Sequence, residues 1–208
     1  MLQIWNSITT TLRFLFAIFL VSVLSPLPDV PGTANREFLA MLSRIEGATS
    51  LVVWKSQYSI TLFKGSSPVK TYWAVFGKGY GDGDKELSGD KRTPEGDFYI
   101  CSMNHSKRFY KFLGLSYPGL KHAQQGLQRG VINPWEYGEI ESAHRERRQP
   151  NWDTRLGGAI GIHGRMLEDP EVWASRQNWT DGCIALPNTD MDELFSIVSI
   201  GTPVTILP

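Results

Sequence analysis

The chain has 208 residues, 41% of them hydrophobic and 12% aromatic, and its 21 basic and 21 acidic residues leave no formal net charge. This length suits one domain with a sizeable core. The balanced charge argues against a nucleic-acid binder, and the aromatic content argues against a disordered chain. Two cysteines, Cys101 and Cys183, are too few for a disulfide scaffold or a zinc finger. We expect two free thiols, no metal and no other cofactor.

The N-terminal segment predicts export. Residues 14–24 form an uncharged apolar run behind Arg13, shorter than the ~20 residues that a membrane-spanning helix needs. No clear cleavage site follows, so two alternatives stay open for residues 1–32: a signal peptide or an N-terminal membrane anchor. Both place the body of the protein in the periplasm or cell envelope, either free or anchored to the inner membrane. Membrane contact is expected only through this segment.

The exported body begins with strand signals. Residues 33–49 form a connection that contains a short amphipathic helix, predicted over residues 36–46. Three strands are then predicted from apolar, β-branched and aromatic runs, at residues 51–54, 58–63 and 69–76. The Gly-Ser-Ser-Pro turn between the last two predicts a hairpin.

The second half of the body alternates strands with helices. Residues 77–91 form a loop with five glycines, and a turn at residues 92–96 leads into a strand over 97–103. Helices are predicted over residues 120–148, in two pieces broken near Asn133 and Pro134. After a short strand at residues 159–163, a helix capped by Asn188 or Thr189 and a last strand at residues 203–207 complete a mostly β domain with helical insertions.

Two other motifs favour ordinary structural roles. The glycine-rich loop does not complete a phosphate-binding motif, and its alternating acids have Leu87 where a calcium loop needs glycine. We interpret it as a surface loop near the site. The basic cluster at residues 144–148 is interrupted by glutamate and fits the solvated end of a helix.

The informative stretches are Gly-Ile-His163-Gly164 and Thr180-Asp181-Gly182-Cys183. A cysteine attacks as a thiolate, so it needs a nearby base, some exposure and backbone donors for an oxyanion. Glycine before Cys183 allows close approach and an unusual backbone angle, and we expect Cys183 to lie directly before a helix whose dipole favours negative charge. From these residues alone, a small buried cysteine and a structural histidine are as plausible as a nucleophile and its base.

At these residues the sequence resembles the L,D-transpeptidase catalytic domain (YkuD-like) family, in its murein L,D-transpeptidase branch. The signature of that family is His-Gly followed by Ser/Thr-x-Gly-Cys, and here sixteen residues separate His163 from Thr180. Segments at residues 89–100, 113–118, 157–164 and 201–204 are also similar. The resemblance covers residues 50–208, which we define as the catalytic domain, and implies a β-sandwich-like, mostly antiparallel fold.

The resemblance implies an enzyme of peptidoglycan stem peptides. Cys183 would attack the carbonyl of the third stem residue, a diamino acid, release the terminal D-alanine and pass the acyl group to an amine of a second stem peptide or a lipoprotein. His163 would be the base and the carbonyl of Gly164 its orienting group. The oxyanion and pocket residues would be Gly182, Thr180, Asp181 and Asn188.

Two residues depart from the pattern of the family. Asp181 replaces a frequent second histidine and would oppose ionisation of the thiol. Ala185 replaces a frequent arginine, whose substrate contact would have to come from Arg165 or another basic residue. Two alternatives to transfer therefore stay open. One is a thiol hydrolase, an L,D-carboxypeptidase or endopeptidase that trims stems or releases wall-attached protein; the other is a non-catalytic wall-binding module. Cys101 matches no motif and is interpreted as structural.

Overall fold

A computed structural model describes residues 47–166 and 177–208. The predicted export segment and the helix at residues 36–46 lie outside the described residues. Within the described parts of the chain, no helix is long and apolar enough to cross a membrane.

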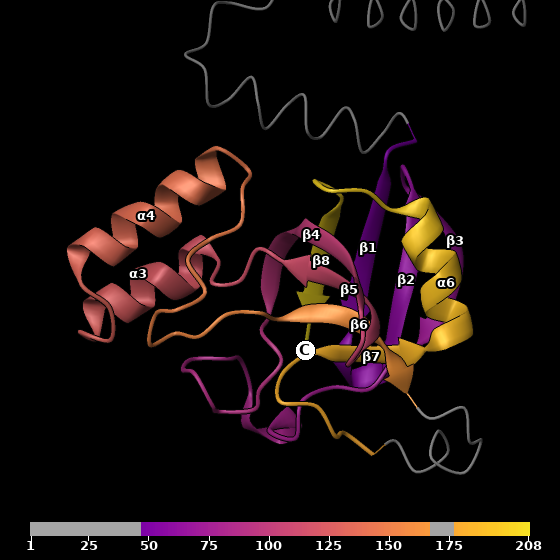
Figure 1. The fold of residues 1–208 in the computed structure, drawn as a ribbon, viewed down its shortest axis with the longest axis horizontal. Helices are drawn as coiled ribbons and strands as arrows, with labels where there is room; N and C mark the ends of the chain where they lie inside the picture. Colours follow the sequence, from indigo (N-terminus) through magenta and orange to yellow (C-terminus); the bar gives the residue numbers. More distant parts are fainter. Residues whose placement is uncertain (1–46, 167–176) are drawn as a thin grey trace, which may run out of the picture. The chain divides into compact units, whose positions relative to one another are not determined.

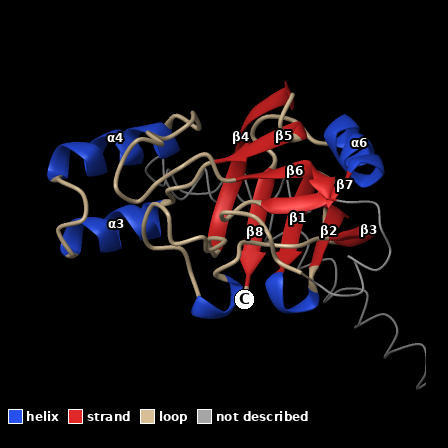
Figure 2. Ribbon diagram, turned by 60° about the horizontal axis from the view of Figure 1, so that its bottom comes forward, coloured by secondary structure: helices blue, strands red, loops and turns tan. Residues whose placement is uncertain are grey.

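Eight strands form one continuous curled sheet in the order β3-β2-β1-β8-β4-β5-β6-β7 (Figures 1 and 2). Five neighbouring pairs are antiparallel, while β1–β8 and β6–β7 are parallel. The strands are β1 (Thr49–Trp54), β2 (Ser59–Lys64), β3 (Ser67–Trp73), β4 (Gly96–Ser106), β5 (Tyr110–Leu115), β6 (Gly161–Met166), β7 (Ile184–Pro187) and β8 (Pro203–Leu207). The expected mostly β, mostly antiparallel architecture with helical insertions is confirmed.

The two ends of the strand order meet. Just beyond β3, Val75 forms an antiparallel bridge with Ala185 of β7, and Gly77 forms a parallel bridge with Thr180. This contact curls the sheet around one apolar core, to which strands from both halves contribute. Its fully buried members include Leu51, Ile60, Leu113, Ile162 and Ile184. Burial of this apolar surface is the main force that holds the sheet in its curled form.

Helix α6 (Asn188–Ile197) packs on β5, β6 and β7. Met191 and Leu194 of this helix, which belong to the predicted apolar stripe, are completely buried. The helix begins differently from the prediction: Pro187 is the N-cap residue, and no side chain caps the first turn. Asn188 is therefore the first helical residue instead of the cap.

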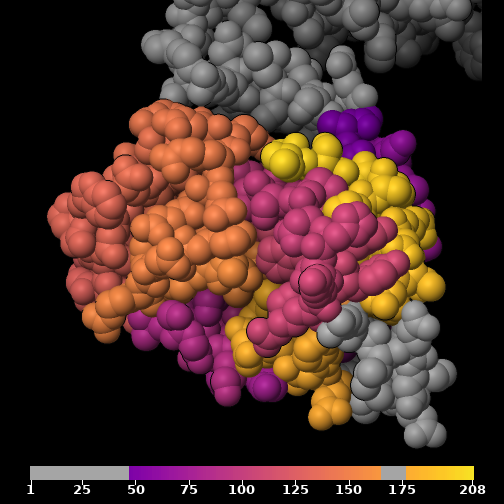
Figure 3. All heavy atoms as spheres, in the orientation of Figure 1, coloured from indigo at the N-terminus to yellow at the C-terminus, as the bar shows by residue number. Residues whose placement is uncertain are grey.

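Helices α3 (Leu120–Gln128) and α4 (Pro134–Arg145) form a separate lobe at the other end of the sheet from α6 (Figures 1 and 3). The predicted break is confirmed: Asn133 caps α4 through a reciprocal capping box with Glu136, and Pro134 occupies the first turn, where its missing N–H costs nothing. The two helices share a small core made by Ala123, Ile132, Ile140 and Leu156.

The largest departures from the sequence-based expectations surround the reactive motif. Strand β5 was not predicted. The strand expected at residues 159–163 is β6, which begins two residues later than expected. Cys183 is followed by the four-residue strand β7 before α6 begins, so the expected placement of Cys183 at a helix N-terminus is wrong. Backbone geometry in the sheet, not a helix dipole, determines the surroundings of the thiol.

Candidate active site

Cys183 and His163 lie on neighbouring parallel segments of chain. The register of β6 and β7 pairs Ile162 with Ile184 and His163 with Ala185. Cys183, one residue ahead of β7, therefore lies across from Gly161, two residues before the histidine. The sixteen-residue insertion between the motifs thus brings the two side chains to the same end of one strand pair.

The imidazole is held in one orientation by its own strand. Nδ1 of His163 lies 2.6 Å from the carbonyl oxygen of Gly164. A carbonyl only accepts hydrogen bonds, so Nδ1 carries the proton and Nε2 keeps a free lone pair. The carbonyl thus fixes the tautomer that a general base for a thiol requires.

Aromatic rings surround the imidazole. The ring centroids of Phe109 and Trp179 lie 4.4 Å and 5.8 Å from that of His163, which is 1% exposed. Burial lowers the pKa of His163 to about 4, and the charge of Arg108 acts in the same direction, although the Gly164 hydrogen bond opposes them. The imidazole is therefore neutral at neutral pH.

The thiol of Cys183 is free and half-buried. It donates to the carbonyl of Ala159 at 3.6 Å, a residue held in the left-handed region at φ 53°. Burial raises the pKa of Cys183 to about 11, while a backbone hydrogen bond from Gly161 and the charge of Lys85 lower it. Asp181 also raises this pKa, in the direction expected from the sequence, but less than burial does.

The Thr180 hydroxyl organises the turn before the cysteine. It donates to the carbonyl of Cys183 at 2.6 Å and accepts the N–H of Gly182 at 3.2 Å. The Gly182 N–H is therefore engaged within the turn, which conflicts with its expected role as an oxyanion donor. The N–H of Cys183 itself remains the candidate donor for an oxyanion.

Two glycines of the motif occupy positions that exclude a side chain. Gly182 has φ +129°, and a Cβ there would lie 2.7 Å from the carbonyl oxygen of Arg92. A Cβ on Gly164 would lie 2.6 Å from Oδ1 of Asn188 and 3.1 Å from Cβ of Tyr110. Asn188 thus lies directly against the residue that orients His163. The side chain of Arg165 is outside the described part of the chain, so its suggested substrate contact stays a prediction.

The loop at residues 77–91, before β4, lies near Cys183, as the sequence predicted. The Asp90 carboxylate accepts the N–H groups of Glu86, Leu87 and Arg92 and the ammonium of Lys85 at 2.7 Å. Burial alone would raise the pKa of Asp90, but these hydrogen bonds hold it below its usual value. Asp90 thus fixes the conformation of the loop.

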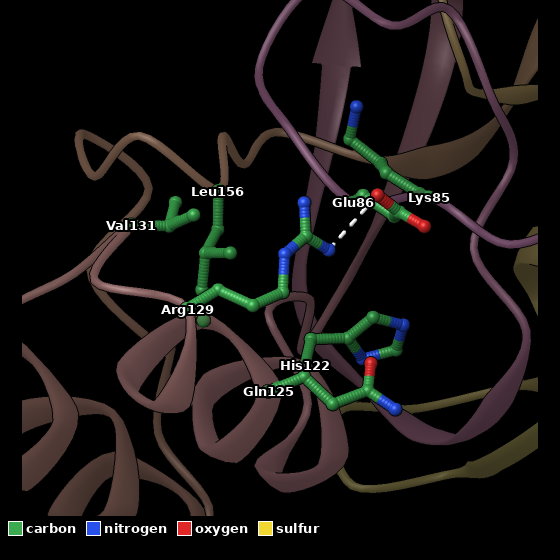
Figure 4. Close-up of a pocket in the computed structure, with 8 residues that line it drawn as sticks. Lys85, Glu86, His122, Gln125, Arg129, Val131 and Leu156 are labelled. Atoms are coloured by element: carbon green, nitrogen blue, oxygen red, sulfur yellow. Dashed lines mark hydrogen bonds and ion pairs between the residues drawn. The ribbon is translucent and has the colours of Figure 1, made fainter.

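Helix α3 ties this loop to the lobe. Arg129 reaches Glu86 at 2.9 Å (Figure 4). The buried His122 contacts Asp84 at 3.1 Å. The same loop also lies against the turn at residues 180–183, here named the catalytic turn. A Cβ on Gly77 would come within 3.0 Å of Cα of Gly182 in that turn.

Sequence reasoning missed several residues near the site. Trp179, adjacent to the motif, was the one that could have been found from its position. Ala159 and Phe109 approach the site only through the pairing of β5 with β6, and Lys85 only through its pairing with Asp90. Among the described residues, no group of three or more histidine, cysteine or carboxylate side chains is placed to hold a metal ion.

Taken together, the curled sheet brings a half-buried cysteine and a carbonyl-oriented histidine onto adjacent parallel segments, which is an arrangement suited to a thiol nucleophile and its base. The family model for the L,D-transpeptidase catalytic domain (YkuD) matches residues 48–206. The chain therefore belongs to this family. No curated protein matches the sequence.

Several solved structures are similar to this chain at low sequence identity. The helical cell shape determining protein Pgp2 from Campylobacter jejuni is 16% identical, with a TM-score of 0.50 over 83% of this chain and 54% of that chain. An L,D-transpeptidase from Xylanimonas cellulosilytica is 15% identical, with a TM-score of 0.46 over 78% of this chain and 61% of that one. Bd1075 of Bdellovibrio bacteriovorus is 17% identical, with a TM-score of 0.49 over 77% and 48%. This chain thus spans about half to three fifths of the length of these proteins.

Proposed function

We propose that this protein is an exported peptidoglycan L,D-transpeptidase in which Cys183 is the nucleophile and His163 the general base. The observation that carries the proposal is the strand pair β6–β7. The segment that bears the thiol runs beside the strand that bears His163, whose Nδ1 proton is committed to Gly164, so that Nε2 is the basic nitrogen. Membership of the family supports peptidoglycan chemistry in general.

Both side chains are neutral in the resting site, since burial raises the pKa of Cys183 to about 11 and lowers that of His163 to about 4. The thiol proton therefore moves to Nε2 as the sulfur attacks, and a thiolate–imidazolium pair is not formed in advance. The sulfur bonds to the carbonyl carbon of the third stem residue, and the negative charge on the oxygen is stabilised by the Cys183 N–H.

Collapse of this intermediate breaks the C–N bond to the terminal D-alanine. The imidazolium returns its proton to the leaving amine, and a thioester on Cys183 remains. An acceptor amine from a second stem peptide or a lipoprotein then attacks the thioester, gives a proton to His163, and releases the sulfur, which takes that proton back. If water is the acceptor, the same site is a thiol hydrolase.

The test is incubation of the purified full chain with disaccharide tetrapeptides, followed by mass spectrometry. Crosslinked dimers, or exchange of the terminal D-alanine for an added D-amino acid, support transfer. Tripeptide as the only product would favour the hydrolase instead. Absence of any product, together with no acylation of Cys183 by a carbapenem, would contradict both enzymes and favour a wall-binding module.

Export is part of the proposal, because stem peptides of the mature wall lie outside the cytoplasm and the apolar run of residues 14–24 has the length of a signal core. The Campylobacter jejuni protein is described as determining helical cell shape, and we propose a role in cell wall organisation and shape here. Fractionation of cells that express the full chain, with and without residues 1–32, measures the location.

A further inference from the structure

An open pocket of about 420 Å³ adjoins the catalytic turn. Asp181, two residues before Cys183, lines one side, and Gly158 and Ile160 line another. These two residues flank Ala159, whose carbonyl accepts a hydrogen bond from the thiol of Cys183. The pocket therefore begins beside the sulfur of Cys183, where the side chain of an acylating residue has to be accommodated.

The pocket offers one available cation. Lys91 lines it, is exposed, and forms no ion pair with any residue in the described ranges. The second lysine of the lining, Lys85, is only 3% exposed, and its ammonium is used by Asp90 and the carbonyl of Leu87.

The pocket also offers one available anion. The Asp181 side chain is 72% exposed, and its contact with Lys78 is 3.7 Å long between two groups that are both more than half exposed. Such a pair contributes little and is easily replaced. The remaining lining includes Gly89, where a Cβ would meet no atom within 4 Å, so that the pocket is open at this position.

The backbone holds Lys91 in a costly conformation. Its φ is 59°, in the left-handed region that glycine or asparagine adopts more easily. Its carbonyl accepts the N–H of Gly79 at 2.9 Å, and the next N–H, that of Arg92, is bound by Asp90 at 3.0 Å. The loop therefore fixes the backbone of this lysine at the pocket, although glycine or asparagine would adopt the same conformation with less strain.

We propose that this pocket binds the zwitterionic end of the diamino acid at the third stem position, with its carboxylate on Lys91 and its ammonium on Asp181. This inference rests on the proposed function, because that residue carries the carbonyl that Cys183 attacks. Its side chain leaves the carbon next to that carbonyl and enters the nearest space beside the sulfur. The exposed acid before the cysteine thus becomes a specificity residue of the donor site.

The test compares three disaccharide tetrapeptides in an assay of D-alanine release, which reports the donor step alone. The third residue is diaminopimelate, lysine, which lacks the distal carboxylate, or diaminopimelate acetylated on its distal amine. We expect the wild-type protein to prefer free diaminopimelate over each of the others by about tenfold in kcat/KM.

Each charge has its own variant. Lys91→Asn suits the left-handed backbone and should reduce the preference for diaminopimelate over lysine to about twofold, with the preference over the acetylated residue retained. Asp181→Asn should do the reverse. Lys64→Gln, at an exposed lysine of β2 that does not line the pocket, should leave all three rates unchanged.

Unchanged preferences in both variants, with an active wild-type protein, would overturn the pocket assignment and leave the proposed function standing. Equal loss on all three substrates would also overturn it, since that pattern reports damage to the catalytic turn. No D-alanine release from any substrate by the wild-type protein would overturn the proposed function and the pocket assignment together.

Discussion

The two cysteines of the chain lie in different regions of the same sheet, and they are similar in exposure and in acidity. Both are free and half-buried, and burial raises the pKa of each to about 11. Their neighbours differ. Cys101 sits at an irregularity of β4, between the paired residues Ile100 and Ser102. Cys183 precedes a strand that runs parallel to the one bearing His163.

Acidity therefore does not identify the nucleophile in this chain. A reactive cysteine is often recognised by a lowered pKa, and neither thiol of this chain has one. What separates them is a base on the adjacent strand and an open pocket on the other side. We therefore expect Cys183 to be activated during attack rather than at rest.

The largest expected effect comes from exchanging the two thiols for alanine. Cys183→Ala should reduce D-alanine release by at least about a thousandfold, since it removes the atom that forms the acyl bond. Cys101→Ala should keep activity within about threefold of wild type. Comparable losses in both variants would erase the distinction between the two regions.

Removal of the base should have the next largest effect. His163→Gln should lower kcat/KM for D-alanine release by about a hundredfold to ten-thousandfold, the usual contribution of a general base. The rate at which iodoacetamide alkylates Cys183 should fall as well, while alkylation of Cys101 stays the same and serves as the internal control. A variant with normal turnover would show that another group takes the proton.

The Thr180 turn should contribute less than either catalytic group. Thr180→Val removes the donor to the Cys183 carbonyl and the acceptor of the Gly182 N–H, and each lost buried hydrogen bond costs about 1–3 kcal/mol. We expect about a tenfold to hundredfold loss of kcat/KM. Thr205→Val, which removes an exposed hydroxyl contact to Asp97, is the matched control and should change activity by less than about twofold.

The pH dependence gives the smallest but most specific signal. His163 has to be neutral to accept a proton, and burial lowers its pKa to about 4. The acid limb of kcat/KM should therefore fall below about pH 4 instead of near 6.5. Between pH 6.5 and 4 the unfolded chain binds a proton that the folded chain does not, so His163 should make the fold less stable as the pH falls through that range.

His163→Gln removes this titration and should flatten that part of the stability curve, as measured by urea unfolding at several pH values. An acid limb near pH 6.5 in the wild-type protein, with the same stability curve in the variant, would contradict the buried neutral imidazole.

Much of the fold follows from local sequence. The hairpin of β2 and β3, the capped break at Asn133 and the C-terminal strand are encoded by turn residues, a capping box and alternation, all of which act over a few residues. Strand β5 escaped prediction because its three C-terminal residues are buried and Gly114 interrupts its pattern. That glycine is needed because a Cβ would meet the Ser102 hydroxyl of the neighbouring strand, a contact between strands that no local pattern reveals.

The candidate site, too, could be predicted only in part from the sequence. The motif residues Cys183 and His163 stand out in the sequence, but the surroundings that set their pKa values come from distant segments. Residues 183–186 were expected only as a segment just before a helix, and β7 was not recognised as a strand because four residues are too few to show a periodic pattern. The Gly182 N–H was expected at the oxyanion, whereas the hydroxyl of Thr180, two residues earlier, engages it. Such competition between donors depends on the fold of the turn.

The most direct test of the account is the covalent intermediate itself. The full chain, mixed briefly with a disaccharide tetrapeptide and quenched in acid, should gain the mass of the disaccharide tripeptide acyl group, and peptide mapping should place that group on Cys183 alone. The adduct should be absent from Cys183→Ala and from unreacted protein. Release of D-alanine by a Cys183→Ala protein, or an acyl group found on Cys101, would contradict the central claim that the strand pair β6–β7 makes Cys183 the nucleophile.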